Sequence, residues 1–189
     1  MIVGILALQG AFIEHANIFK KLNVNSILVK NKEDLEKINA LIIPGGESTS
    51  IGKLLDAFHI KSSLEEKIKE GLPVWGTCAG MILLAKKILN DDRIHMPLID
   101  ITVIRNGYGR QLGSFCIHEK IKGIEKPFPM VFIRAPYIDE VGRDVEILGK
   151  VDEKIVAAKQ NNILVTSFHP ELTDDFRMHQ YFLNMIKKR

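Results

Sequence analysis

Short apolar runs alternate with amphipathic stretches through the first half of this chain, and that order restricts the fold more than any other feature. Runs rich in β-branched and other apolar residues predict buried strands at residues 2–8, 26–29, 40–43 and 73–75. The amphipathic stretches predict helices at residues 12–22, 50–58 and 63–70, and a further helix that starts at Ala79. Strands that alternate with helices in this way form a parallel sheet with helices on both faces.

The second half of the chain departs from this alternation. Between Asp100 and Val156, strands separated by turns predict an antiparallel excursion from the parallel sheet. Residues 162–168 then return as a buried strand, and residues 175–187 predict a closing amphipathic helix. We therefore expect an α/β fold, a flavodoxin-like three-layer sandwich with a mostly parallel central sheet and a small antiparallel excursion. With 189 residues, the chain is long enough for one domain over residues 1–189 and too short for two ordinary ones.

Composition restricts the compartment and the class of partner. Apolar residues make up 46% of the chain and charged residues 26%, which is the balance of a soluble globular protein. The net charge is +3 and the lysines are scattered, so we expect no nucleic-acid partner. The apolar run at residues 2–8 lacks a basic flank and is too short for a membrane helix, which argues against a membrane partner. Two cysteines exclude a disulfide scaffold and favour the reduced cytoplasm.

One of those cysteines, Cys78, lies where a predicted strand passes into a helix. Its surroundings read Gly76-Thr77-Cys78-Ala79-Gly80, and small residues around a nucleophile at such a junction permit a sharp turn that exposes its side chain. The N-terminus of the following helix carries a partial positive charge that favours the thiolate. Most buried cysteines are merely packed, but a packed cysteine does not require glycines on both sides. The pattern therefore predicts a nucleophile elbow.

A candidate base and its orienting group follow the last apolar strand, in the sequence His169-Pro170-Glu171. A histidine can accept the thiol proton, and a carboxylate bonded to its other ring nitrogen fixes its orientation. Pro170 restricts the backbone between the two side chains. Gly10, the Gly45-Gly46 pair, Cys78 and His169 all come just after a predicted strand. We expect them at one edge of the sheet, where α/β sheets place their sites.

Acyl-transfer chemistry also needs amide donors for a negatively charged oxygen. In an elbow, the amide of Ala79 directly after the nucleophile supplies one of these donors. The loop Pro44-Gly45-Gly46-Glu47-Ser48 can supply the second, since its glycines expose backbone N–H groups. The alternative role of this loop is to bind phosphate, but it lacks the lysine and the spacing of a P-loop.

These motifs resemble the class I, or triad, glutamine amidotransferases, and among them the glutaminase subunits of pyridoxal 5′-phosphate synthases. The similarity extends over the whole chain. It is carried by residues 6–10 with Glu14-His15, and by residues 44–49, 75–85, 105–106, 109–111, 114–115, 132–136 and 168–175. The Cys78 and His169-Pro170-Glu171 motifs are shared by many triad amidotransferases. The start at residues 6–10, the loop at residues 44–49 and the ending at residues 171–175 are closer to the vitamin B6 subunit.

The resemblance implies a role for each matching residue in glutamine hydrolysis. Cys78 attacks the side-chain amide of L-glutamine and releases ammonia, and water then hydrolyses the glutamyl thioester. His169 acts as base and acid, and Glu171 orients it. Further implied roles are substrate binding by Gly46, Glu47, Ser48, Arg105, Ile133 and Arg134, oxyanion stabilisation by Gly46 and Ala79, and activation by the partner through Gln9 and Gly10.

The resemblance also implies a partner but no cofactor and no metal. The partner is the pyridoxal 5′-phosphate synthase subunit, which receives the ammonia within a ring complex holding twelve copies of each subunit. An alternative is the glutaminase subunit of another amidotransferase, such as imidazole glycerol phosphate synthase. A cysteine peptidase or stress protein on a similar sheet is a further alternative, although the His-x-Glu spacing argues against it. A non-catalytic module would be expected to lack one of the three residues Cys78, His169 and Glu171.

Other polar residues receive a different interpretation. We divide Glu14 and His15 evenly between partner contact and ordinary surface. Arg177 and His179 are expected on the polar face of the last helix. Cys116 lacks the glycines of an elbow and is expected to be packed.

Overall fold

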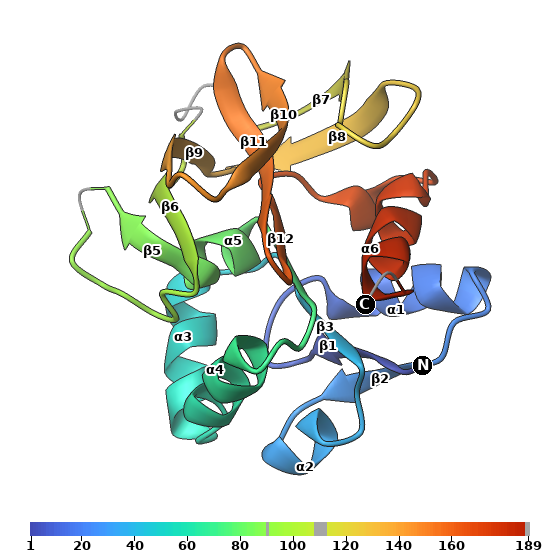
Figure 1. Ribbon diagram of the computed structural model, residues 1–189, viewed down its shortest axis with the longest axis vertical. Coiled ribbons are helices and arrows are strands. Elements are labelled where there is room, and N and C mark those ends of the chain that lie inside the picture. The colour runs from blue at the N-terminus through green and yellow to red at the C-terminus, as the bar shows by residue number, and fades with distance from the viewer. Residues whose placement is uncertain (90, 108–112, 188–189) are drawn as a thin grey trace.

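The computed structural model describes residues 1–89, 91–107 and 113–187, and a mixed sheet runs through the middle of the molecule (Figure 1). The motif at residues 109–111 and the terminal Lys188 and Arg189 therefore lie outside the described residues. Within these ranges the sheet has ten strands. They are β1 (Val3–Leu6), β2 (Ser26–Val29), β3 (Ala40–Ile43), β4 (Val74–Thr77), β5 (Ala85–Ile88), β6 (Ile99–Ile104), β9 (Tyr137–Val141), β10 (Glu146–Val151), β11 (Lys154–Gln160) and β12 (Ile163–Thr166). They follow the order β2-β1-β3-β4-β12-β11-β9-β6-β5, with β10 paired to β11.

The half of the sheet from β2 to β12 is parallel, as the alternating sequence predicts. Strands β1, β3, β4 and β12 are buried along their whole length, and this explains why they read as continuous apolar runs rather than as alternating ones. The register pairs Ile5 of β1 with Ile42 of β3, and Ile42 with Trp75 of β4. Neighbouring strands therefore end close to the same level, and their carboxyl ends form one edge.

Helices cover both faces of this parallel half. The helices α1 (Phe12–Lys21) and α6 (Arg177–Lys187) lie on one side of the sheet. The helices α3 (Ser48–Ala57), α4 (Lys61–Lys69) and α5 (Ala79–Leu84) lie on the other, with the short α2 (Lys32–Leu35). Each face has its own apolar core, one built on Phe19, Trp75 and Phe182 and the other on Ile51, Leu64 and Leu83. The three-layer fold and the mostly parallel sheet are confirmed.

The antiparallel excursion is confirmed, but most of it continues the main sheet. Strands β6, β9, β10 and β11 pair antiparallel with one another, and β11 pairs antiparallel with β12. A separate two-stranded sheet consists of β7 (Ser114–Glu119) and β8 (Phe128–Ile133). Its Phe128 and Phe132 pack on Phe168, which lies just after β12. The hairpin thus covers the segment that leads to His169.

Several element boundaries differ from the sequence prediction for local reasons. Helix α3 begins at Ser48 rather than at residue 50, because the Glu47 side chain caps it by accepting the backbone N–H groups of Thr49 (3.0 Å) and Ser50 (2.6 Å). Neither α2 nor β5 was predicted from the sequence. The prediction that Cys116 is packed was wrong: β7 alternates between exposed and half-buried positions, and Cys116 lies on the exposed side.

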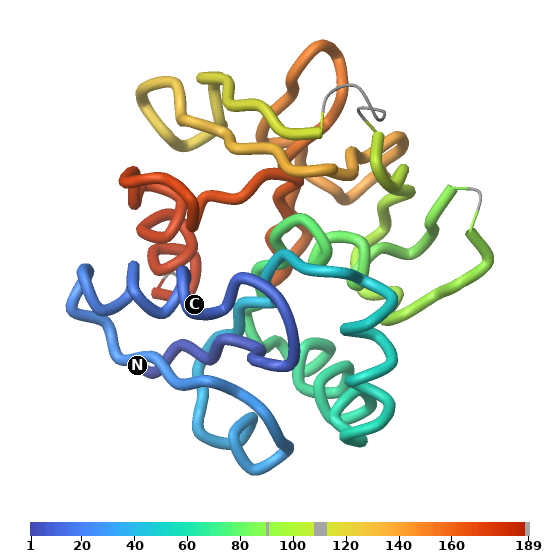
Figure 2. The backbone as a smooth tube through the Cα atoms, turned by 180° about the vertical axis from the view of Figure 1, so that it is seen from behind, coloured from blue at the N-terminus to red at the C-terminus, as the bar shows by residue number. Residues whose placement is uncertain are grey.

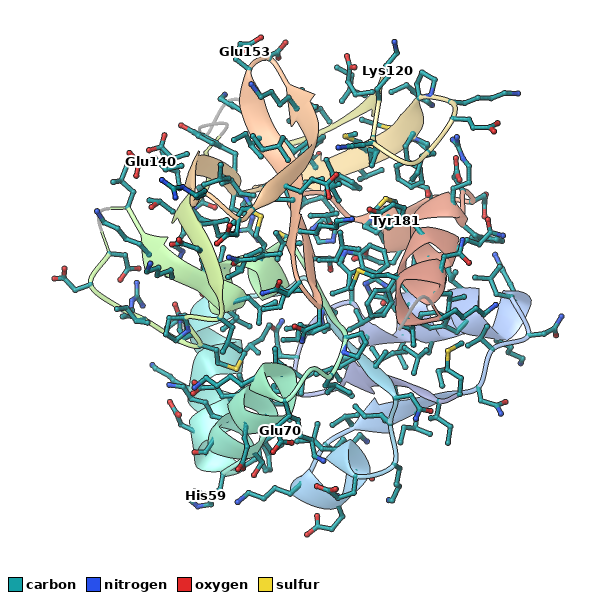
Figure 3. The ribbon with its side chains drawn as sticks, viewed as in Figure 1. His59, Glu70, Lys120, Glu140, Glu153 and Tyr181 are labelled. Carbon is teal, nitrogen blue, oxygen red and sulfur yellow. The ribbon has the colours of Figure 1, made fainter. Side chains whose placement is uncertain are left out.

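The first and last helices of the chain pack together, and side chains fill the interior of the molecule. Helices α1 and α6, which come from opposite ends of the sequence, lie side by side in both orientations (Figures 1 and 2). Side chains fill the space between the sheet and its helices, whereas His59 and Glu153 lie at the periphery (Figure 3). Within the described ranges, no helix combines the length and the apolar character needed to cross a membrane.

Candidate active site

Cys78 is the turn between β4 and α5, and its backbone is strained. Its φ is 48° and its ψ is −101°, a combination that side-chain-bearing residues rarely adopt. The neighbouring glycines permit the tight packing: a Cβ at Gly80 would lie 2.1 Å from the carbonyl oxygen of Ile43, and one at Gly76 would lie 2.6 Å from the backbone of Gly80. The predicted elbow is therefore present, and its glycines are required by close backbone contacts.

His169 and Glu171 face this elbow from the segment after β12. The His169 backbone N–H donates to the carbonyl of Val131 in β8 at 2.8 Å, and its side-chain Nδ1 lies 2.7 Å from Glu171 Oε1. Since an ionised carboxylate only accepts, Nδ1 carries the proton in this bond. A Cβ at Gly45 would lie 2.3 Å from His169 Cε1 and 3.4 Å from Cys78 Cβ, so the same glycine borders both side chains. The three residues thus form a Cys–His–Glu arrangement.

The charges of the cluster favour a protonated His169. Burial is the largest single influence on the pKa of His169 and lowers it, but hydrogen bonding and charge interactions with Cys78 and Glu171 together raise it to about 10. His169 is 7% exposed and Glu171 is 6% exposed, so these interactions are weakly screened. An imidazolium beside the sulfur stabilises a thiolate, and it is also a proton donor for a leaving amine.

A cleft of about 480 Å³ opens over Cys78 at the carboxyl edge of the sheet. Every predicted site residue lines it except Ala79 and Glu171; the ten that do are Gln9, Gly10, Gly46, Glu47, Ser48, Cys78, Arg105, Ile133, Arg134 and His169. Ala79 begins α5, where the first amides have no carbonyl partner within the helix, and Glu171 lies beside His169 Nδ1. The predicted convergence of strand ends is therefore present. Within the described residues, no cluster of three or more His, Cys, Asp or Glu side chains is arranged to hold a metal ion.

The residues after β1 hold the glycine loop in place. Gln9 Oε1 accepts the backbone N–H of Glu47 at 2.8 Å, and the backbone N–H of Ala11 donates to the carbonyl of Gly45 at 2.9 Å. Gly10 lies between these two contacts with a φ of 104°, and a Cβ on it would lie only 1.9 Å from the Gly45 carbonyl oxygen. This segment therefore contacts the glycine loop on both sides of Gly46.

Arg105 occupies the opposite wall of the cleft and is held by two carboxylates. Its guanidinium lies 3.4 Å from Glu47 Oε1 and 3.1 Å from Asp91 Oδ2. Asp91 is in turn paired with Arg93, and Arg93 donates to Thr49 Oγ1 at 3.0 Å. Although burial is the largest influence on the pKa of Glu47 and raises it, hydrogen bonds from Ser50 and Thr49 lower it to about 2. The sequence analysis missed Asp91 and Arg93, and no local pattern around them indicates this role.

Two histidines were assigned wrongly from the sequence. His15 was divided between partner contact and surface, and His179 was expected on a polar face, yet both are fully buried. Only Glu14 of the first pair is exposed. The spacing of apolar residues around His15 and His179 indicates that each histidine is buried. His15 is three residues after Phe12 and four before Phe19, and His179 precedes Phe182 by three, so each lies on the apolar side of its helix.

Comparison with known proteins identifies the family of the chain. Residues 5–188 match the family model of the SNO glutamine amidotransferase family. The pyridoxal 5′-phosphate synthase subunit PdxT of Clostridium botulinum is 57% identical over 188 residues, covering 98% of this chain and 97% of the relative. The protein of that name from Ruminiclostridium cellulolyticum is 53% identical, covering 97% and 98%. A glutamine amidotransferase crystal structure superposes with a TM-score of 0.94 at 42% identity, covering 99% of this chain and all of that one. The chain belongs to the SNO glutamine amidotransferase family.

Proposed function

We propose that this protein hydrolyses L-glutamine to L-glutamate and ammonia, and that the ammonia is used to make pyridoxal 5′-phosphate. The observation that carries the proposal is the buried Cys78–His169–Glu171 arrangement at the floor of the cleft. The cleft is of the size that small-molecule sites usually have. The names of the relatives that match along almost the full chain support the pathway.

The reaction begins with attack on the side-chain amide of glutamine. The Cys78 thiolate forms a bond to the amide carbon, and the carbonyl oxygen takes up the negative charge. The backbone N–H groups of Gly46 and Ala79 stabilise that oxygen. The His169 imidazolium donates its proton to the nitrogen, the carbon–nitrogen bond breaks, and ammonia leaves with a thioester on Cys78.

The second half of the reaction returns the enzyme to its starting state. Neutral His169 removes a proton from water, and the hydroxide attacks the thioester carbon. The carbon–sulfur bond then breaks, which releases glutamate and regenerates the Cys78 thiolate beside an imidazolium. Throughout, Glu171 keeps Nδ1 protonated so that the other ring nitrogen serves the reacting atoms.

Substrate binding is assigned to the loop of Gly46, Glu47 and Ser48 and to the wall formed by Arg105, Ile133 and Arg134. The guanidinium of Arg105 suits the α-carboxylate of glutamine, since the two groups form a bidentate pair. Glu47 lies 3.4 Å from that guanidinium and is available for the α-ammonium group. Together these groups select an amino acid rather than a peptide, and this supports glutaminase over peptidase chemistry.

The proposed partner is a pyridoxal 5′-phosphate synthase subunit that takes up the ammonia in the cytoplasm, in a ring of twelve copies of each subunit. Gln9 and Gly10 are the proposed route by which docking activates hydrolysis, because they hold the loop that carries the Gly46 amide. The alternative of an imidazole glycerol phosphate synthase subunit is not favoured, since the similar relatives are named for pyridoxal 5′-phosphate synthesis.

Glutamate release from glutamine, measured with and without the synthase subunit, tests the proposal. Stimulation by that subunit, and formation of pyridoxal 5′-phosphate when the two sugar phosphates are added, are the expected results. Glutaminase activity that ignores the synthase subunit would exclude the pathway, and the absence of glutamine hydrolysis in the mixture would exclude the reaction.

A further inference from the structure

Behind the catalytic residues lies a buried chain of polar groups that the reaction scheme does not use. It consists of Glu171, His15 from α1 and His179 from α6. Both histidines have 0% exposure, and the Glu171 side chain has 0% exposure. The two helices come from opposite ends of the sequence and lie side by side (Figures 1 and 2). Burying two imidazoles and a carboxylate is unfavourable unless each polar atom finds a partner.

The distances fix the direction of the hydrogen bonds. His15 Nδ1 lies 3.0 Å from His179 Nε2, and His15 Nε2 lies 3.4 Å from Glu171 Oε2. Because the carboxylate only accepts, a hydrogen bond across this 3.4 Å separation requires the His15 proton on Nε2, and its bare Nδ1 would then accept from His179 Nε2. His179 Nδ1 is left without a proton, which fits the finding that it has no hydrogen-bond partner among the described residues.

Both histidines are neutral in this arrangement. Burial, followed by the charges of His179 and His169, holds the pKa of His15 well below its usual range. Burial alone lowers the pKa of His179 to about 3. The chain therefore presents an N–H group to Glu171 without placing a second positive charge beside the His169 imidazolium.

The two oxygens of the carboxylate have different surroundings. Oε1 lies 2.7 Å from His169 Nδ1, whereas Oε2 and the facing His15 Nε2, 3.4 Å apart, have no other hydrogen-bond partner within the described residues. Aromatic rings hold this donor in place: Trp75 packs against both histidines, with centroids 5.8 Å from His15 and 5.0 Å from His179. Without His15, Oε2 would be buried with nothing to keep the carboxylate in its orientation.

We propose that His15 is a positioning residue for glutamine hydrolysis, donating its Nε2–H to Glu171 and so fixing the carboxylate that orients His169, while His179 holds His15 in that tautomer. The kinetic consequences of this inference rest on the proposed function. The direction of the hydrogen bonds is independent of that function. Loss of the donor lowers kcat more than it changes KM, because the cleft residues that bind substrate stay in place.

The kinetic test compares His15→Phe, which keeps a ring but removes the donor, with His15→Gln, which restores an N–H at a similar reach. With the synthase subunit present, His15→Phe is expected to lower kcat about tenfold to a hundredfold, the range seen when outer partners of metal-bound histidines are removed. KM should stay within about twofold, the alkaline limb of kcat/KM should move to lower pH, and His15→Gln should recover most of the activity.

Phe182→Leu is the matched control, because Phe182 packs on Trp75 with ring centroids 5.7 Å apart and donates no hydrogen bond. It perturbs the same aromatic cluster, and its kcat should stay within about threefold of the wild type. A His15→Phe protein with the kcat and pH profile of the wild type would overturn the proposal. The proposal would also be overturned if the two variants lowered the melting temperature equally and His15→Phe lowered kcat no more than Phe182→Leu did.

Nitrogen-15 NMR of the histidine rings tests the arrangement independently of activity. The expected spectrum has His15 and His179 both neutral, each with its proton on Nε2, and unchanged between pH 6 and 9. Protonation of His15 on Nδ1, or a His15 that titrates in this range, would overturn the proposal. If the wild-type protein proves inactive on glutamine, the proposed function fails, and the ring tautomers alone then decide the inference.

Discussion

Replacing Gly10 by alanine tests how the segment after β1 controls the oxyanion loop. Gly10 has a φ of 104°, and an added Cβ would lie 1.9 Å from the carbonyl oxygen of Gly45. Real Cβ atoms essentially never approach a neighbour more closely than 3.0 Å, so the two backbones must separate by about 1.1 Å. Both partners in this contact are main chain, so no side-chain rotation relieves it.

The structure gives a magnitude for both stability and activity. A side-chain-bearing residue in this backbone region costs about 1–3 kcal/mol, and each kcal/mol lowers the melting temperature of a domain of this size by roughly 2–4 °C. The expected fall is therefore about 2–12 °C. A displacement of about 1 Å in a group that stabilises the transition state lowers the rate on the order of a hundredfold. In the proposed mechanism, the displaced group is the Gly46 amide.

The assay is glutamate release with the synthase subunit at saturation, together with a thermal melt of the free subunit. Gly113→Ala is the control, because a Cβ at Gly113 meets no atom within 4 Å. It should match the wild type in both measurements. A Gly10→Ala protein with the kcat/KM and melting temperature of the wild type would refute the argument, since the close contact would then be absent in solution.

Further predictions concern the residues of the cleft. Cys78→Ala should abolish glutamine hydrolysis while synthase binding persists, as checked by glutamate release and gel filtration; residual turnover at the wild-type rate would assign the nucleophile elsewhere. Glu171→Gln should lower kcat less than Cys78→Ala, because an orienting group is partly replaceable. Arg105→Lys should raise KM for glutamine more than it lowers kcat, because an ammonium cannot form the bidentate pair; an unchanged KM would contradict this. Because the folded-state pKa of His169 is raised to about 10, its stabilising contribution is present below about pH 6.5 and is lost as pH rises through 10. Urea unfolding should therefore show stability falling over that range, and falling less in Cys78→Ala, which lacks one of the interactions that raise the pKa.

The Cys78–His169–Glu171 arrangement could be predicted from sequence because its signals are local. An elbow needs small residues next to the nucleophile, and the strand before Cys78 and the helix after it are each visible in a short window. His169 and Glu171 are two residues apart, so their mutual bond at 2.7 Å follows from a single tight segment. The sequence also predicted that the site residues share one edge of the sheet, because parallel strands place their carboxyl ends together.

The cluster behind the triad could not be assigned from sequence, because it depends on which helix faces lie next to each other. His15 and His179 are 164 positions apart and meet only because α1 and α6 pack side by side on one face of the sheet. The apolar spacing around each could have indicated burial, but not the partner. Asp91 likewise pairs with Arg105, which is 14 positions away in the sequence, and no local pattern predicts that contact.

The sequence by itself determined the layered α/β fold, the strand that ends at each site residue, and the residues proposed as nucleophile, base and orienting carboxylate. These follow from hydrophobic periodicity and from the steric needs of short segments, both of which act between near neighbours in the chain. Only the tertiary structure decided that the antiparallel strands extend the main sheet, that Arg105 is held by two carboxylates, and that two neutral histidines stand behind Glu171. These features arise from packing between elements distant in sequence, where burial changes the charge state of a side chain and proximity supplies its partner.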